Sequence, residues 1–228
     1  METARALPRA LMGGTTAMRA AGKKYLTDEV KESDESYARR LKRSFLFNGY
    51  GKALNDMVGK VFSKNIVLDE SVPPELVEWA ENVDLAGRKL DVFGRDAFKD
   101  AMTEGVSYIY TDMDAAPEGL VTLADTASRR PWLVHIKACQ VLGWRAAIIG
   151  GVETLVQFRY RDDQVEYDGD FGEKSVPQIR VLTNDNGVSW ATYRKPEAAV
   201  TGAEWIIHAQ GRIDLSEIPI APVYANRT

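Results

Sequence analysis

The sequence predicts an α+β protein in which helices occupy the first half of the chain and a mostly antiparallel β meander occupies the second. Apolar residues recur every three or four positions before residue 104, which is the period of a helix that buries one face. From Val106 onward, short runs of β-branched and aromatic residues alternate with turn residues. We divide the chain into a basic N-terminal arm at 1–32, a helical region at 33–104, and a β-rich region at 105–228 that packs with the helices as one domain.

The N-terminal arm combines small residues with positive charge and contains few acids before Asp28. Its basic residues are Arg5, Arg9, Arg19, Lys23 and Lys24. Pro8 and the Gly13-Gly14 pair interrupt helical structure, because proline lacks the amide donor and glycine loses the most backbone freedom in a helix. We expect an arm that docks on a neighbouring subunit. A targeting or amphipathic membrane helix is the alternative.

A long helix is predicted to begin at Ser33, because Ser33-Asp34-Glu35 supplies a polar cap and acids for the positive helix end. Its buried stripe is formed by apolar residues at helical spacing: Tyr37, Leu41, Phe45, Leu54, Met57, Val58, Val61 and Phe62. Gly49 and Gly51 are the points where this helix would bend or split.

Four basic residues, Arg39, Arg40, Lys42 and Arg43, lie along the start of this segment. We interpret them as a solvated face whose charge is compensated by Asp34, Glu35 and Asp56. The alternative is a patch that faces an anion.

Two further helices complete the helical region. Val72-Pro73-Pro74-Glu75 reads as a turn into a short helix that carries Trp79, since proline is tolerated at the first helical position. The spacing of apolar residues predicts a second helix from Leu85 to Thr103, and Gly105 stands where a left-handed C-terminal cap is expected.

Several strands are predicted after this cap. They are Val106 to Asp112, Trp132 to Ile136, Leu155 to Tyr160, Gln178 to Leu182, Ser189 to Arg194 and Trp205 to Ala209, with a polar loop from Asp112 to Gly119. The segment Asn184-Asp185-Asn186-Gly187 supplies the positive-φ residues of a tight hairpin between two of these strands.

Composition limits the classes of function. The 228 residues include Lys+Arg 29 against Asp+Glu 33, so the net charge of -4 gives no global attraction for nucleic acid. Cys139 is the only cysteine, which excludes an intrachain disulfide and fits a reducing compartment. The sequence contains no apolar run long enough for a membrane span.

The usual signatures of catalysis are missing from the sequence. No phosphate-binding GxxxxGK[ST] loop occurs, and the Gly13-Gly14 and Gly150-Gly151 pairs read as turns. His135 and His208 lack a second ligand at zinc-binding spacing, and we expect Cys139 and His135 to pack rather than form a nucleophilic pair. We therefore predict no catalytic, cofactor-binding or metal-binding residues, no cofactor and no enzymatic activity.

Two acidic loops are the exceptions worth testing. One is Asp112-Met113-Asp114 with Glu118, and the other contains Asp162, Asp163, Asp168, Asp170 and Glu173. Clustered carboxylates suit hard cations, and a pair of them could serve a glycosidase, but neither loop has calcium-loop spacing and solvated turns are the simpler interpretation. The five tryptophans, Trp79, Trp132, Trp144, Trp190 and Trp205, are interpreted as packing residues, with stacking on bases or sugars as the alternative.

Five stretches carry a family resemblance. They are RALMGGTTAMRAAGKKYL (9–26), ESDESYARRLKRSFLFNGY (32–50), DLAGRKLDVFGRDAF (84–98), RPWLVHIKACQVLGWR (130–145) and IPIAPVY (218–224). In these the chain resembles a family of phage and prophage proteins grouped with the portal proteins of tailed phages. The order of a long helix, a helix ending at EGVSYIY (104–110) and a meander also resembles the wing region of portals.

The resemblance implies a structural virion protein. Such proteins form a usually dodecameric ring at one capsid vertex, through which a terminase motor packages double-stranded DNA without sequence-specific binding, and which capsid and head-tail adaptor proteins contact. It implies production in the cytoplasm of the bacterial host and no contact with membranes. Family members continue past the position equivalent to Thr228 into a channel helix, a clip and a crown, so we expect this chain to correspond to the wing-like part.

Two alternatives to this function remain open. One is a stand-alone module that binds a protein or a glycan through the β region and its tryptophans. The other is a carboxylate-dependent hydrolase, which would lose turnover on Asp112→Ala or Asp170→Ala.

Overall fold

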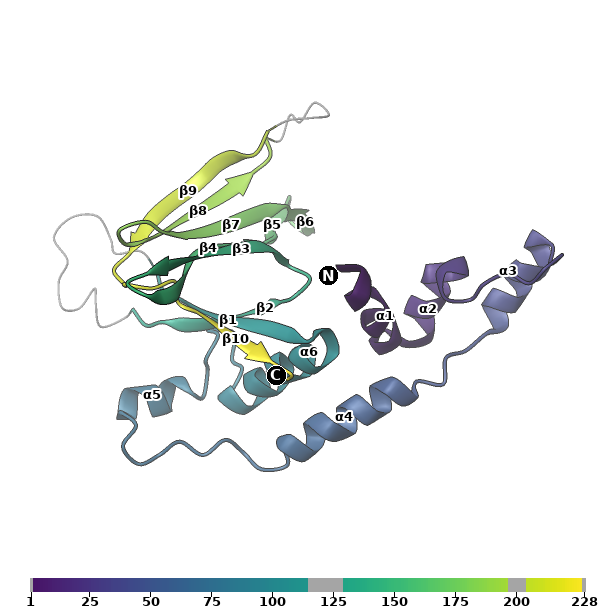
Figure 1. Cartoon of the computed structure of the whole chain (residues 1–228), viewed down its shortest axis with the longest axis horizontal. Helices are drawn as coiled ribbons and strands as arrows, with labels where there is room; N and C mark the ends of the chain where they lie inside the picture. Colours follow the sequence, from purple (N-terminus) through teal and green to yellow (C-terminus); the bar gives the residue numbers. More distant parts are fainter. Residues whose placement is uncertain (1, 115–128, 197–203, 227–228) are drawn as a thin grey trace. The chain divides into compact units, whose positions relative to one another are not determined.

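A computed structural model describes residues 2–114, 129–196 and 204–226. It confirms the α+β class, with helices first and antiparallel strands after them (Figure 1). The chain divides into two compact units. The helical unit comprises Met1–Ser107 and Pro222–Thr228, and the β unit comprises Tyr108–Ala221. The arm at 1–32 therefore belongs to the same unit as the helices at 33–104.

The elements follow one another in a simple order. The helices are α1 (Glu2–Met12), α2 (Gly14–Ala21), the 3-10 turn η1 (Gly22–Lys24), α3 (Asp34–Arg43), α4 (Gly49–Val61), α5 (Pro74–Trp79) and α6 (Leu90–Glu104). The strands are β1 (Val106–Asp112), β2 (Trp132–Lys137), β3 (Val141–Ile149), β4 (Val152–Arg161), β5 (Gln164–Asp168), β6 (Gly172–Val176), β7 (Gln178–Asn184), β8 (Val188–Arg194), β9 (Ile206–Ile213) and β10 (Ile220–Tyr224).

The N-terminal arm is helical and is hydrogen-bonded to the end of α6 in the same chain. The Arg5 guanidinium donates to the Glu104 carbonyl oxygen over 3.0 Å, and Arg9 donates to both Glu104 carboxylate oxygens at 3.0 and 3.1 Å. The predicted interruption at Pro8 is wrong, because α1 runs through it. The predicted break at Gly13-Gly14 is confirmed, since α1 ends at Met12 and α2 begins at Gly14. The docking of this arm on a neighbouring subunit stays a prediction.

The long helix predicted from Ser33 is split, as the sequence allowed, but the predicted place of the split is wrong. The two helices are separated at 44–48, and Gly49 and Gly51 lie within α4. The Ser44 hydroxyl donates back to the Leu41 carbonyl, and Asn48 caps α4 by accepting from the Gly51 amide over 2.7 Å. The Asn48 side-chain amide also donates to the Leu11 carbonyl over 2.9 Å, so the break anchors α1. Three residues assigned to the buried stripe are exposed: Phe45, in this break, at 80%, and Met57 and Val61, on α4, at 53% and 60%.

The helix predicted from Leu85 begins five residues later, at Leu90. The Asp84 carboxylate accepts from the backbone amides of Ala86 and Arg88, and Leu85 and Gly87 adopt positive φ, which is incompatible with a helix. The predicted end of this helix is confirmed.

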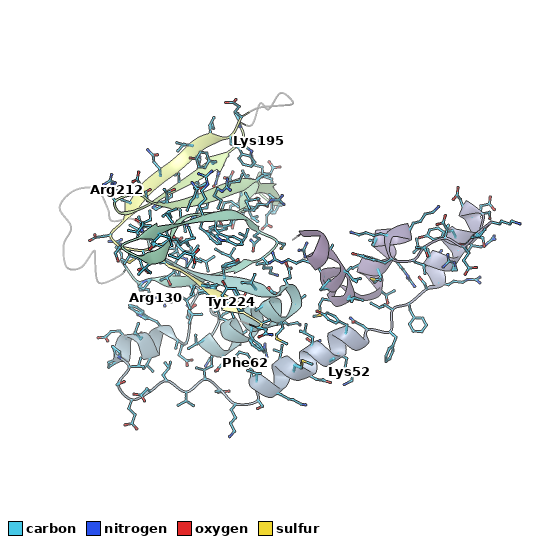
Figure 2. The ribbon with its side chains drawn as sticks, in the orientation of Figure 1. Lys52, Phe62, Arg130, Lys195, Arg212 and Tyr224 are labelled. Atoms are coloured by element: carbon cyan, nitrogen blue, oxygen red, sulfur yellow. The ribbon has the colours of Figure 1, made fainter. Side chains whose placement is uncertain are left out.

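Gly105 forms the left-handed cap of α6 at φ 89°. The short helix predicted after Pro73-Pro74 is present as α5. In Figure 2 Phe62 lies at the end of α4. Its ring centroid is 5.9 Å from that of Phe98, which joins α4 to α6.

Five strands form one antiparallel sheet in the order β3-β4-β7-β8-β9 (Figure 1). The hairpin predicted at 184–187 is confirmed, with positive φ at Asn186 and Gly187. Gly150 and Gly151 form the β3–β4 turn, also with positive φ, as the turn interpretation requires. A second sheet has the order β10-β1-β2, and β5 pairs with β6.

The core of the β unit is aromatic and lies on one face of the five-stranded sheet. Tyr108 on β1 meets Phe158 edge-on at 5.2 Å, and Tyr110 meets Tyr160 at 6.5 Å between ring centroids. Leu182 on β7 pairs with Phe158 and is fully buried. These contacts define the inner face of the five-stranded sheet, and side chains of opposite parity form its outer face.

Four strands were not predicted: β3, β5, β6 and β10. β3 begins with a glycine-interrupted run and lies at the sheet edge, and β5 and β6 occupy the stretch interpreted as an acidic loop. β10 contains Pro222, which argues against a strand in sequence analysis. The predicted polar loop at 112–119 extends beyond the described residues after 114.

Candidate functional site

The β unit contains a half-buried charge cluster centred on Arg180 of β7. Its guanidinium donates to Asp112 Oδ2 over 2.5 Å, and its Nε lies 3.0 Å from Asp162 Oδ2. Asp112 ends β1 and Asp162 follows β4, so the arginine joins three segments. The ring centroids of Tyr110 and Trp190 lie 6.0 and 5.7 Å from the Arg180 guanidinium carbon, so both rings make cation–π contacts with the guanidinium group.

The cluster continues along the inner face as a chain of polar contacts. The Gln178 side-chain amide donates to Asp162 Oδ2 over 3.2 Å, and Arg194 Nε donates to the Gln178 carbonyl oxygen over 2.6 Å. Arg194 also reaches Glu166 on β5 over 2.6 Å. The short β5–β6 ribbon is thereby attached to the five-stranded sheet.

Burial governs the electrostatics of this cluster. Desolvation raises the pKa of the Asp162 carboxyl above its ordinary value, although Arg180 and the Gln178 amide lower it in part. Desolvation also raises the pKa of Tyr110 and of Tyr160. Both phenols therefore stay protonated at neutral pH, and the Tyr110 hydroxyl donates to Asp112 Oδ1 over 2.9 Å.

Arg180 remains charged at any accessible pH. Burial acts to lower its pKa, but Tyr160 and the two carboxylates outweigh that effect and the net shift is upward. Since Asp112 and Asp162 each hold a guanidinium contact and a second donor, their oxygens are engaged within the protein. The arrangement ties the end of β1 to β4 and β7 of the five-stranded sheet, and sequence analysis missed it because it did not single out Arg180.

The two predicted acidic loops are thus brought together through one residue from each. Asp163 accepts from the Gln178 amide, and Asp168 and Glu173 are exposed on β5 and β6 beside the turn that contains Asp170. Glu118 lies outside the described residues. Within the described ranges, no group of three or more His, Cys, Asp or Glu side chains is placed to hold a metal ion.

His135 lies in β2 and Cys139 lies two residues after its end, with the buried residues Ile136 and Ala138 between them in the chain. Both are half-buried, and Cys139 is a free thiol. His208 is exposed on β9, in a different sheet. The structure does not gather the two histidines.

The tryptophans are distributed rather than gathered in a groove. Trp190 covers Arg180, and Trp205 lies under the Lys195 ammonium at 5.5 Å. Trp144 is 47% exposed on edge strand β3, while Trp79 and Trp132 are half-buried.

The basic residues of α3 are only partly compensated, and by other acids than those predicted. Arg40 pairs with Glu32 at 2.6 Å and lies over the Tyr37 ring. The predicted partners Asp34 and Asp56 instead face Lys23 and Lys52.

Uncovered apolar side chains are the most prominent feature of the helical unit. On α4, Leu54 and Val58 are buried, whereas Tyr50, Met57 and Val61 form an adjacent stripe that is 37%, 53% and 60% exposed. Phe45 and Phe47, in the preceding connection, are 80% and 84% exposed, and Val67 after α4 is 89% exposed. Contiguous exposed apolar patches are typical of surfaces that another chain covers, and Tyr50, Met57 and Val61 recur at helical spacing along one side of α4.

No protein-family model matches the chain, and a search of curated proteins finds no match. Among the helices in the described part of the chain, none combines the length and apolarity needed to cross a membrane.

Proposed function

We propose that this chain is a structural subunit of a phage particle, a portal or portal-like protein whose copies associate in a ring at the capsid vertex. The family resemblance in the sequence supports the portal type. The observation that carries self-association is the uncovered apolar surface of the helical unit, with Phe45, Phe47 and Val61 each at least 60% exposed.

In this proposal the function lies in assembly geometry. The ring subunits contact one another, the capsid, the terminase and the head-tail adaptor, and double-stranded DNA passes without sequence-specific binding. The protein is made in the host cytoplasm and ends in the virion. The Arg180 cluster has a supporting role, since it joins β1, β4 and β7 through Asp112 and Asp162.

Native mass spectrometry of the protein from its natural source tests the proposal, because it reports the chain length and the assembly together. A large closed homo-oligomer from the head-tail vertex is the expected result. A protein that is absent from particles and stays monomeric at micromolar concentration would contradict it.

A matched pair of α4 variants tests the surface itself. Val61→Lys places a charge in the exposed apolar stripe, and Asn55→Lys places the same charge at an exposed polar position of the same helix. We expect Val61→Lys to weaken association at least about tenfold, because the charge must be desolvated at the interface, and Asn55→Lys to leave it unchanged. Equal effects of the two variants would refute the role of this stripe.

A further inference from the structure

Four arginines lie on the outer face of the five-stranded sheet, the face opposite the aromatic core. They are Arg145 on β3, Arg159 and Arg161 on β4, and Arg212 on β9. Successive side chains of a strand point to opposite faces, so Arg159 and Arg161 on β4 face away from the core that contains Phe158. Cross-strand partners share a face of a sheet, and the register places Arg145 and Arg212 on this same outer face.

The register places a complete polar row across the sheet. Arg145 pairs with Gln157, Gln157 with Thr183, Thr183 with Ser189, and Ser189 with Arg212. With four strand spacings of about 4.8 Å, the row spans roughly 19 Å and has an arginine at each end. Figure 2 labels the Arg212 end of this row, on β9.

A second row runs beside the first and adds a third cation. Gly143 pairs with Arg159, Arg159 with Val181, Val181 with Ala191, and Ala191 with Gln210. A side chain at position 143 would meet the Arg159 guanidinium at 2.9 Å, so the arginine reaches across the glycine toward β3. The two rows contribute Thr183, Ser189, Gln210 and Arg212 to a shallow groove of about 410 Å³.

The charge of this face is not neutralised within the described residues. None of the four arginine side chains has a carboxylate partner there, although the protein as a whole carries a net charge of -4. Arg145, Arg161 and Arg212 are exposed, and Arg159 is half-buried. Glu153 is the acidic residue within β4 and lies at its start, and Asp162 and Asp163 follow its end.

We infer that this outer face, hereafter the arginine face, binds the phosphodiester backbone of nucleic acid. Guanidinium groups match phosphate oxygens in geometry, and the hydroxyl and amide side chains between them are the other groups that contact phosphates. The groove on this face combines its polar residues and Arg212 with the apolar and aromatic residues Val181, Trp190 and Tyr193. Its cationic and polar groups suit nucleic acid, because protein–nucleic acid interfaces are more polar and more positively charged than protein–protein interfaces. The inference depends only on the strand register of the β unit and not on the assembly proposed above.

The contacts would read charge and not sequence, because phosphates carry no base information. The full chain is therefore titrated into fluorescein-labelled 30-base-pair duplexes of two unrelated sequences and into single-stranded dT30, with anisotropy read from 50 to 200 mM salt. Four phosphate contacts predict a log-log salt slope of about -3.6 on the duplex, a loss of roughly 100-fold in affinity over this range. The two duplexes are expected to bind equally, and comparison with dT30 identifies which form of nucleic acid is preferred.

Matched double variants locate the site. Arg145→Gln/Arg212→Gln removes both ends of the polar row, and Arg39→Gln/Arg43→Gln removes the same charge from exposed positions of α3. We expect the first variant to lower affinity at 50 mM salt at least about tenfold and to reduce the slope by about 1.8, and the second to change neither. Thermal melting of both variants is expected to match the parent, since all four side chains are exposed.

Three outcomes would overturn the inference. The first is no binding of duplex or dT30 at 50 mM salt, and the second is binding that depends on Arg39 and Arg43 instead. The third concerns residues 65–87, which hold six acidic and no basic side chains. If a peptide of this segment binds the protein, if that binding is lost in Arg145→Gln/Arg212→Gln, and if DNA does not bind, then the arginine face contacts a second copy of the chain instead of nucleic acid.

Discussion

Arg180 is the residue whose loss should cost the β unit most. In Arg180→Met the side-chain volume is largely kept, but Asp112 and Asp162 lose the guanidinium that faces both of them. Their side chains are only 16% and 19% exposed. Removing one partner of a buried charge pair leaves the other uncompensated, which costs about 3–5 kcal/mol. For a unit of this size we expect the melting temperature to fall by roughly 15 °C.

The same variant has a pH signature. The folded-state pKa of Asp162 already lies above its ordinary value because of burial, and loss of Arg180 raises it further. A carboxyl whose pKa is raised on folding disfavours the folded state progressively as pH rises from its unfolded pKa to its folded pKa, and the penalty is complete above the folded pKa. The destabilisation of Arg180→Met is therefore larger at pH 8 than at pH 5. The difference in the free energy of unfolding is about 1.4 kcal/mol for each unit by which the folded-state pKa of Asp162 in the variant exceeds 5.

Urea unfolding at pH 5 and pH 8, followed by tryptophan fluorescence, measures both quantities, since Trp190 lies against Arg180. Arg161→Met is the control, because this neighbouring arginine is exposed and its loss should change the free energy of unfolding by less than about 0.5 kcal/mol. Equal effects of the two variants, or a loss for Arg180→Met that is independent of pH, would refute the reasoning.

Three further predictions concern the helical unit. Phe93→Ala, at a side chain that is 1% exposed, should lower the free energy of unfolding by about 3–5 kcal/mol, whereas Val67→Ala, at an 89% exposed position, should change it by less than about 0.5 kcal/mol in urea titrations. Gly105→Ala should cost about 1–2 kcal/mol by the same measurement because of its left-handed φ of 89°, and a neutral result would exclude this cap conformation. Glu104→Gln removes the carboxylate that Arg9 contacts, so hydrogen exchange of α1 amides should accelerate about tenfold, and unchanged protection would mean that other contacts hold the helix.

Local signals in the sequence predicted the elements that depend on short-range chemistry. The cap at Ser33, the proline start of α5, the Gly105 end of α6 and the hairpin at Asn186-Gly187 each require particular residues at fixed positions, and each is present in the structure. The strands with clear β-branched and aromatic runs were predicted for the same reason, as β1 and β8 illustrate.

The errors arise where a long-range partner outweighs a local pattern. The apolar spacing from Tyr37 to Phe62 continues through 44–48, but Asn48 ends that continuity by capping α4 and bonding to Leu11, far away in the sequence. Similarly, β10 forms despite Pro222, because it is an edge strand of its sheet and an edge strand leaves one side of its backbone without ladder hydrogen bonds.

The sequence by itself determined the α+β class, the helix caps and the turns, because these depend on residues that lie close together in the chain. Only the tertiary structure decided which charges meet. Asp112, Asp162 and Arg180 are separated in sequence and become one cluster because β4 pairs with β7 and β1 packs against β4. The register of the five-stranded sheet also collects Arg145 and Arg212 on a single face. Charge in the sequence is a sum over residues, whereas binding and stability depend on distance and burial, which arise only when the sheet forms.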